Sequence, residues 1–92
     1  MKPVRISNHA RLQMYLRGAL EEEVVKSIQL GEWKPAKTGK FQSKWRFNFN
    51  LTAPANQRFY KYKTVESIFA EEPDEIVIIT VKVYYSNEEV IS

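Results

Sequence analysis

The sequence has no cysteine, and histidine occurs once among its 92 residues, at position 9. A chain without cysteine forms no disulfide framework, no thiolate nucleophile and no zinc–thiolate cluster. Transition-metal sites usually use several His or Cys ligands, so we expect no bound metal, and no other cofactor either. The composition therefore argues first against metal-dependent and thiol-dependent enzymes.

Long apolar runs are also missing. No stretch approaches the roughly 20 apolar residues that cross a bilayer as a helix, and the N-terminus has no signal-peptide pattern. We therefore expect a cytoplasmic protein with no membrane partner. Hydrophobic residues make up 43% and charged residues 27% of the chain, a balance typical of globular proteins. We expect a single domain over residues 1–92.

Acidic residues are absent from two segments. Residues 1–20 and 33–63 contain lysines and arginines but no Asp or Glu, although the net charge is only +3. The acids lie in residues 21–32 and 64–92. Such segregation predicts one basic face, which is the electrostatic footprint of a polyanion-binding protein, with RNA as the expected partner. The alternative is that the acidic segments neutralise these cations after folding.

Two helices are predicted in the first third of the chain. Ser7 can cap a helix that runs to about Arg17, and Gly18 suits the left-handed position after its end. The acids at 21–23 suit the start of a second helix, which Gly31 ends. The short connection between them indicates a helical hairpin.

After Gly31 the hydrophobic period changes to two. Residues 44–51 alternate between aromatic or leucine side chains and polar ones, so we expect the aromatic side to face the helices. A short strand near residues 33–37 would pair with this strand, and residues 58–70 and 75–85 are predicted as two more. We predict an α+β fold, α-α-β-β-β-β, with the helical hairpin on one face of a mainly antiparallel four-stranded sheet.

The N-terminal segment resembles a large family of small uncharacterised bacterial domains, whose signature is S-x-H-A-x-x-R-M-x-x-R-G. Residues 6–31 read I-S-N-H-A-R-L-Q-M-Y-L-R-G-A-L-E-E-E-V-V-K-S-I-Q-L-G, and residues 76–81 match a late strand of the family, whereas the middle of the chain is unmatched. The positions that fit are His9, Ala10, Met14, Arg17, Gly18, Glu22, Glu23, Val24, Thr80 and Val81. These domains are similar to RelE/ParE/BrnT-like toxins with a barnase/RelE-type fold.

Two positions depart from the family pattern. Gln13 stands where the family has an arginine, which removes a cation that could bind phosphate. Leu20 stands where the family has a Ser or Thr that would cap the second helix. The resemblance implies a toxin-type, metal-independent endoribonuclease, with an antitoxin or immunity protein as its protein partner.

Metal-independent RNA cleavage by 2′-hydroxyl attack needs a proton acceptor, a proton donor and cations at the phosphate. Histidine is the natural acid/base near neutral pH, so His9 is the candidate for that role, and Arg17 can clamp phosphate. Thr80 and Tyr84 share one face of the last strand and can orient it. Each of the four also has a simpler interpretation. His9 can be a polar residue at a helix start, and Arg17 a cation at a helix end. Thr80 can serve strand packing, and Tyr84 can be an ordinary strand tyrosine.

Cations alternate with aromatic residues in the middle of the chain, a pattern that suits single-stranded RNA. The predicted RNA contacts are Arg11, Arg46, Lys61, Lys63 and Tyr62. The alternative function is a non-catalytic RNA- or protein-binding module of the same fold, and a third is an interaction protein that pairs through an exposed strand edge. Convergence of His9, Arg17 and Thr80 in one cleft would favour the enzyme.

Overall fold

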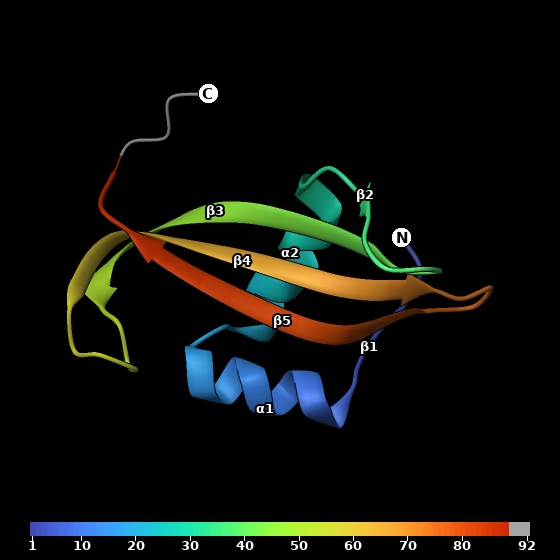
Figure 1. Ribbon diagram of the computed structural model, residues 1–92, viewed down its shortest axis with the longest axis horizontal. Coiled ribbons are helices and arrows are strands. Elements are labelled where there is room, and N and C mark those ends of the chain that lie inside the picture. The colour runs from blue at the N-terminus through green and yellow to red at the C-terminus, as the bar shows by residue number, and fades with distance from the viewer. Residues whose placement is uncertain (89–92) are drawn as a thin grey trace.

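A computed structural model describes residues 1–88 and shows an α+β architecture of two helices and one five-stranded sheet (Figure 1). The strands lie in the order β1-β5-β4-β3-β2. In chain order the elements are β1 (Val4–Ile6), α1 (Asn8–Arg17), α2 (Glu21–Leu30), β2 (Lys34–Pro35), β3 (Phe41–Thr52), β4 (Phe59–Glu71) and β5 (Ile76–Ser86).

The predicted sheet of four antiparallel strands was wrong in one respect. A fifth strand, β1, precedes the helices and pairs in parallel with β5, placing Val4 opposite Ile76 and Ile6 opposite Ile78. The three other strand pairs are antiparallel, as predicted. A three-residue strand is too short to show alternation, and its partner lies more than 70 residues away, so no local pattern marks it.

Both helices begin and end where the sequence predicts. The Ser7 hydroxyl accepts the N–H of Ala10 at 3.1 Å and caps α1, and Gly18 follows it with φ of 84°. Leu20 has no side-chain acceptor, yet the start of α2 is still closed: the Glu23 carboxylate accepts the N–H of Leu20 at 2.9 Å. Local capping interactions therefore mark where both helices begin.

Helix α2 lies behind the sheet in Figure 1, and α1 runs along the β5 edge. Val24 and Ile28 of α2 are buried in one core with Val65 and Phe69 of β4. Three serines tie α2 to the sheet inside this core. The Ser27 and Ser67 hydroxyls lie 2.8 Å apart, and the Ser43 hydroxyl donates to the Ser27 carbonyl at 2.6 Å. The sheet face under α2 is thereby fixed as the interior face.

The aromatic side of β3 faces the helices, but it supplies only part of the core. Trp45 lies opposite Val65 on that side and is still 41% exposed. A bulge between Asn48 and Leu51 breaks the alternation, and Leu51 is exposed. The aromatic centre of the core is instead a cluster of Trp33, Phe41 and Phe69, with ring centroids 4.8 to 6.0 Å apart.

Candidate nucleic-acid interface

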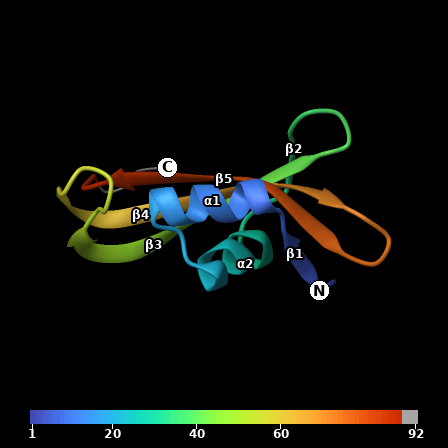
Figure 2. The same ribbon diagram turned by 90° about the horizontal axis from the view of Figure 1, so that it is seen from below.

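The sheet face opposite α2 is termed the open face. Figures 1 and 2 show that neither helix covers it, because α2 lies on the other side and α1 lies beside the β5 edge. Strand register arranges twelve of its side chains as four rows across β3, β4 and β5. The rows are Gln42–Ile68–Thr80, Lys44–Glu66–Lys82, Arg46–Thr64–Tyr84 and Asn48–Tyr62–Ser86.

Positive charge predominates on the open face. Its four rows contain Lys44, Arg46 and Lys82 against a single acid, Glu66. Lys34 extends the first row, since it lies opposite Gln42. Among the residues that the structure describes, none of the open-face lysines belongs to an ion pair. The segregation of charge seen in the sequence thus produces a basic surface.

Two aromatic side chains lie among these cations. The Arg46 guanidinium sits over the ring of Tyr62, 4.2 Å from its centroid, so this pair forms a packed patch. Tyr84 lies in the row of Arg46, beyond Thr64, and is 51% exposed. Tyr84 is therefore the ring on this face best placed to receive an unpaired base.

Two adjoining hollows lie beside β5 and share Thr80 and Lys82. The first, termed the loop hollow, measures about 320 Å³ under the loop between β2 and β3, and the second, the edge hollow, measures about 420 Å³ between α1 and β5. The loop hollow is lined by Ala36, Lys37, Lys40, Gln42, Ile68, Ile79, Thr80 and Lys82. The edge hollow is lined by Gln13, Arg17, Thr80, Lys82, Val83 and Tyr84.

The edge hollow brings together three of the four predicted catalytic residues, Arg17, Thr80 and Tyr84. His9 is exposed in the first turn of α1 and is not among the residues that line it. Arg17 follows His9 by eight positions, which corresponds to about 12 Å along the helix axis. The convergence that would favour an enzyme is thus incomplete.

The outer edge of β5 is closed by side chains of α1. Arg17 donates to the Val81 carbonyl at 2.6 Å, and the Gln13 side-chain carbonyl accepts the Val81 N–H at 2.8 Å. The two side chains therefore replace a neighbouring strand at this residue. The Gln13 side chain supplies an acceptor that an arginine at this position would lack. Arg17 has a structural role whether or not it also meets phosphate.

Tyr85 joins β5 to the end of α1. Its hydroxyl donates to the Arg17 carbonyl at 2.6 Å, and burial, followed by the nearby charge of Glu23, raises its pKa above the ordinary 10. The folded state holds the Tyr85 proton more tightly than the unfolded state does. The hydroxyl therefore contributes fully to the stability of the fold below pH 10, and this contribution is lost as the pH rises through the folded pKa.

A Tyr85→Phe variant tests this linkage. We expect it to be less stable than the wild type at pH 8 and to lose less stability between pH 9 and about 11.5, where tyrosines titrate. Urea unfolding at a series of pH values measures the difference. Parallel pH profiles for the two proteins would show that Tyr85 does not titrate with folding.

The remaining predicted RNA contacts are spread over the molecule. Lys63 is almost fully enclosed: its ammonium pairs with Glu23 at 2.7 Å and donates to the Gly18 carbonyl at 2.9 Å. It faces the interior, so we leave it out of the candidate interface. Arg11 is on the surface of α1 and pairs with Glu21 at 3.6 Å. Lys61 is exposed near the start of β4.

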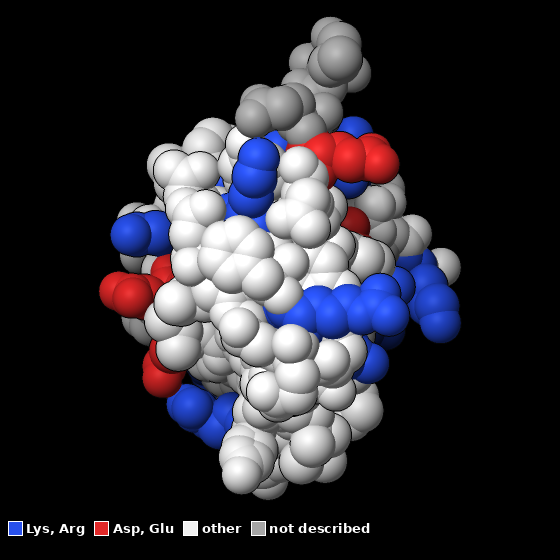
Figure 3. Space-filling model, turned by 90° about the vertical axis from the view of Figure 1, so that its left-hand side faces the viewer, with Lys and Arg blue, Asp and Glu red and all other residues white. Residues whose placement is uncertain are grey.

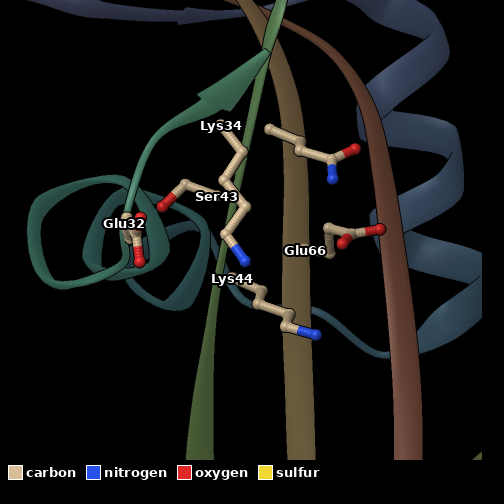
Figure 4. Close-up of a pocket in the computed structure, with 6 residues that line it drawn as sticks. Glu32, Lys34, Ser43, Lys44 and Glu66 are labelled. Atoms are coloured by element: carbon tan, nitrogen blue, oxygen red, sulfur yellow. The ribbon is translucent and has the colours of Figure 1, made fainter. Parts of the chain in front are cut away.

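A third hollow, of about 210 Å³, lies at the β3 edge where β2 begins (Figure 4). Lys34 and Lys44 line it together with Glu32 and Glu66. Two acids balance two cations there, so it offers no net charge to an anion. It marks the boundary of the basic surface.

Figure 3 views the end of the molecule that carries the loop between β3 and β4. Uncharged residues dominate this end, and most charged side chains lie around its margin. Leu51 and Phe59, at the adjoining ends of the two strands, are both exposed. We therefore assign the polyanion surface to the open face rather than to this end.

Sequence reasoning missed Lys44, Lys82 and the loop lysines Lys37 and Lys40. The signal was present for the two strand lysines, because Lys44 precedes Arg46 by two residues and Lys82 lies between Thr80 and Tyr84 in the alternation of β5. No comparable signal brings the loop lysines over β5, because that approach is tertiary.

In comparisons with known proteins, no family model, curated protein or solved structure matches this chain. In the part of the chain that the structure describes, no helix is long and apolar enough to cross a membrane. No group of three or more His, Cys, Asp or Glu side chains is placed to hold a metal ion among residues 1–88.

Proposed function

We propose that the protein binds single-stranded RNA across the open face of its sheet. The observation that carries this proposal is the set of cations in the rows of β3 and β5, which form no ion pair among the described residues. Only one acid lies among them, and an exposed tyrosine lies beside them. Cations that neutralise phosphates supply most of the affinity of such surfaces. Aromatic rings add stacking with unpaired bases.

Single strands fit this face better than duplexes do. Tyr84 can stack only on a base that is not already stacked within a helix. The polar side chains of the rows, such as Gln42, Thr64 and Asn48, can hydrogen-bond base edges and the 2′-hydroxyl that distinguishes RNA from DNA. The role of the chain on this view is recognition, either alone or as part of a larger RNA-directed assembly.

Fluorescence anisotropy with a labelled RNA of about 12 nucleotides, within the length range that one such surface covers, tests the proposal. We expect the single strand to bind more tightly than the same sequence in a duplex, and log K to fall linearly with log salt. RNA of the same sequence should bind better than DNA. Absence of binding at low salt, or binding that salt does not weaken, would refute the proposal.

The edge hollow favours a second candidate function, a metal-independent endoribonuclease of the RelE/BrnT type whose partner would be an antitoxin or immunity protein. Arg17, Thr80 and Tyr84 line this hollow, and Lys82 adds a cation. His9 would have to reach the hollow from the first turn of α1 when RNA is bound. Incubation with RNA in EDTA, beside a His9→Ala variant, tests this candidate: cleavage that the variant abolishes supports it, and no cleavage by the wild type refutes it.

A further inference from the structure

The loop hollow is walled by a defined turn. The Lys40 N–H donates to the Lys37 carbonyl at 2.8 Å, and Gly39 in the turn adopts φ of 74°, a conformation that glycine accepts without strain. The Ala36 N–H in turn donates to the Lys40 carbonyl at 3.0 Å. The Cα atoms of the first and fourth residues of such a turn lie within about 7 Å of each other, so the side chains of Lys37 and Lys40 leave the backbone at neighbouring points.

The turn rises on the side of the sheet away from α2, as Figure 2 shows for the segment between β2 and β3. It therefore stands as a wall at one end of the open face. A nucleic-acid strand that follows the rows toward Gln42 and Thr80 meets this wall.

An irregularity of β5 shapes the floor of the hollow. Ile68 pairs with Thr80 and Phe69 pairs with Ile78, so Ile79 is an extra residue in the ladder. Neighbouring residues of a regular strand point to opposite faces, but Ile79 and Thr80 line the same hollow. A bulge redirects side chains in this way. Together with Ile68, Ile79 provides an apolar surface beside the Thr80 hydroxyl and the Gln42 amide.

The charge of the loop hollow distinguishes it from the hollow at the β3 edge. Lys37, Lys40 and Lys82 line it, no acid does, and none of the three joins an ion pair among the described residues. An internal phosphodiester carries one negative charge, whereas a phosphomonoester carries about −1.5 to −2 at pH 7. Three cations in one hollow suit the monoester better. The volume of about 320 Å³ falls within the range of small-ligand sites.

We propose that the loop hollow binds the phosphorylated end of an RNA strand. The terminal phosphate lies among Lys37, Lys40 and Lys82, and the terminal base lies on Ile68 and Ile79. This inference rests on the proposed RNA binding by the open face, and it adds that the strand ends at the turn. Either a 5′- or a 3′-phosphate has this chemistry.

Three labelled RNAs of one sequence test the inference: one with a 5′-phosphate, one with a 3′-phosphate and one with hydroxyls at both ends. We expect one phosphorylated strand to bind about five- to tenfold more tightly than the hydroxyl strand at low salt. A Lys37→Gln/Lys40→Gln variant should lose this preference and keep most of its affinity for the hydroxyl strand. Lys26→Gln, on the exposed side of α2, is the control and should keep the preference.

A titration with uridine 5′- and 3′-monophosphate, followed by the NMR signal of the Gly39 amide, separates the two proposals. Shifts with a monophosphate but no binding of any strand would overturn RNA binding by the open face and retain the phosphate site. Equal affinity for all three strands would overturn the phosphate site and retain RNA binding. No response to either probe would overturn both.

Discussion

Replacing Lys44 and Lys82 together by glutamine should lower the affinity for single-stranded RNA at least about tenfold at about 0.1 M salt. The two lysines flank Glu66 in one row of the open face, and neither belongs to an ion pair among the described residues. Each phosphate contact contributes about −0.7 to the slope of log K against log salt for a single strand. The slope should therefore become shallower by about 1.4.

The same row provides a control of opposite sign. Glu66→Gln removes the one acid of the row while leaving both lysines in place, so affinity should rise, by about threefold. Lys26→Gln should leave affinity almost unchanged, and the thermal midpoints of all variants should stay close to that of the wild type. If the double lysine variant binds RNA as well as the wild type does, with the same salt slope, the open face is not the binding surface.

Replacing Glu23 by alanine should lower the free energy of unfolding by about 3–5 kcal/mol, the cost typical of breaking a buried ion pair from one side. The Lys63 side chain is only 4% exposed and that of Glu23 13%, so the variant leaves an ammonium in the interior without its carboxylate. It also removes the acceptor of the Leu20 N–H at the start of α2. Urea unfolding measures the loss.

Removing the charge of Lys63 as well should recover part of this stability. Lys63→Met retains an apolar side chain beside Phe49, whose ring centroid lies 5.0 Å from the ammonium in the wild type. We expect Glu23→Ala/Lys63→Met to be more stable than Glu23→Ala alone, because no unpaired charge remains inside. If the double variant instead loses as much stability as Glu23→Ala and Lys63→Met lose in sum, this interpretation of the pair is wrong. RNA binding by the folded double variant should match that of the wild type.

The helices were predictable because their signals are local. Ser7, Gly18 and the acids at 21–23 act on the backbone within one turn, so sequence neighbours alone decide where each helix begins and ends. Strand β1 was not predictable for the opposite reason: its pairing with Ile76 and Ile78 depends on a segment at the other end of the chain.

The site was predicted in part. Alternation placed Arg46 on the polar side of one strand and Thr80 and Tyr84 on one face of another, and only the register of the sheet brings them together with Tyr62 on one surface. Lys63 was assigned by its charge, although it shares its side of β4 with the buried Val65 and the pattern therefore pointed inward. The enclosing partner, Glu23, comes from α2, which no pattern in β4 reveals.

The position of α1 beside β5 could not be derived from the sequence. The sequence does not show that Gln13 and Arg17 would close the edge at Val81, leaving His9 outside the edge hollow. The extra residue Ile79 lies within a continuous apolar run, where one position looks like the next. Both features arise from tertiary packing, and both determine the shape of the candidate site.

Photo-crosslinking with a 4-thiouridine-containing single strand tests RNA binding by the open face most directly, because it shows where RNA touches the protein. Mass spectrometry of the digested complex should find the crosslinks on β3, β4 and β5, above all on the peptide that contains Tyr84, and Tyr84→Ala should reduce their yield there. Crosslinks confined to α1 or α2, with none on the three strands, would contradict binding by the open face.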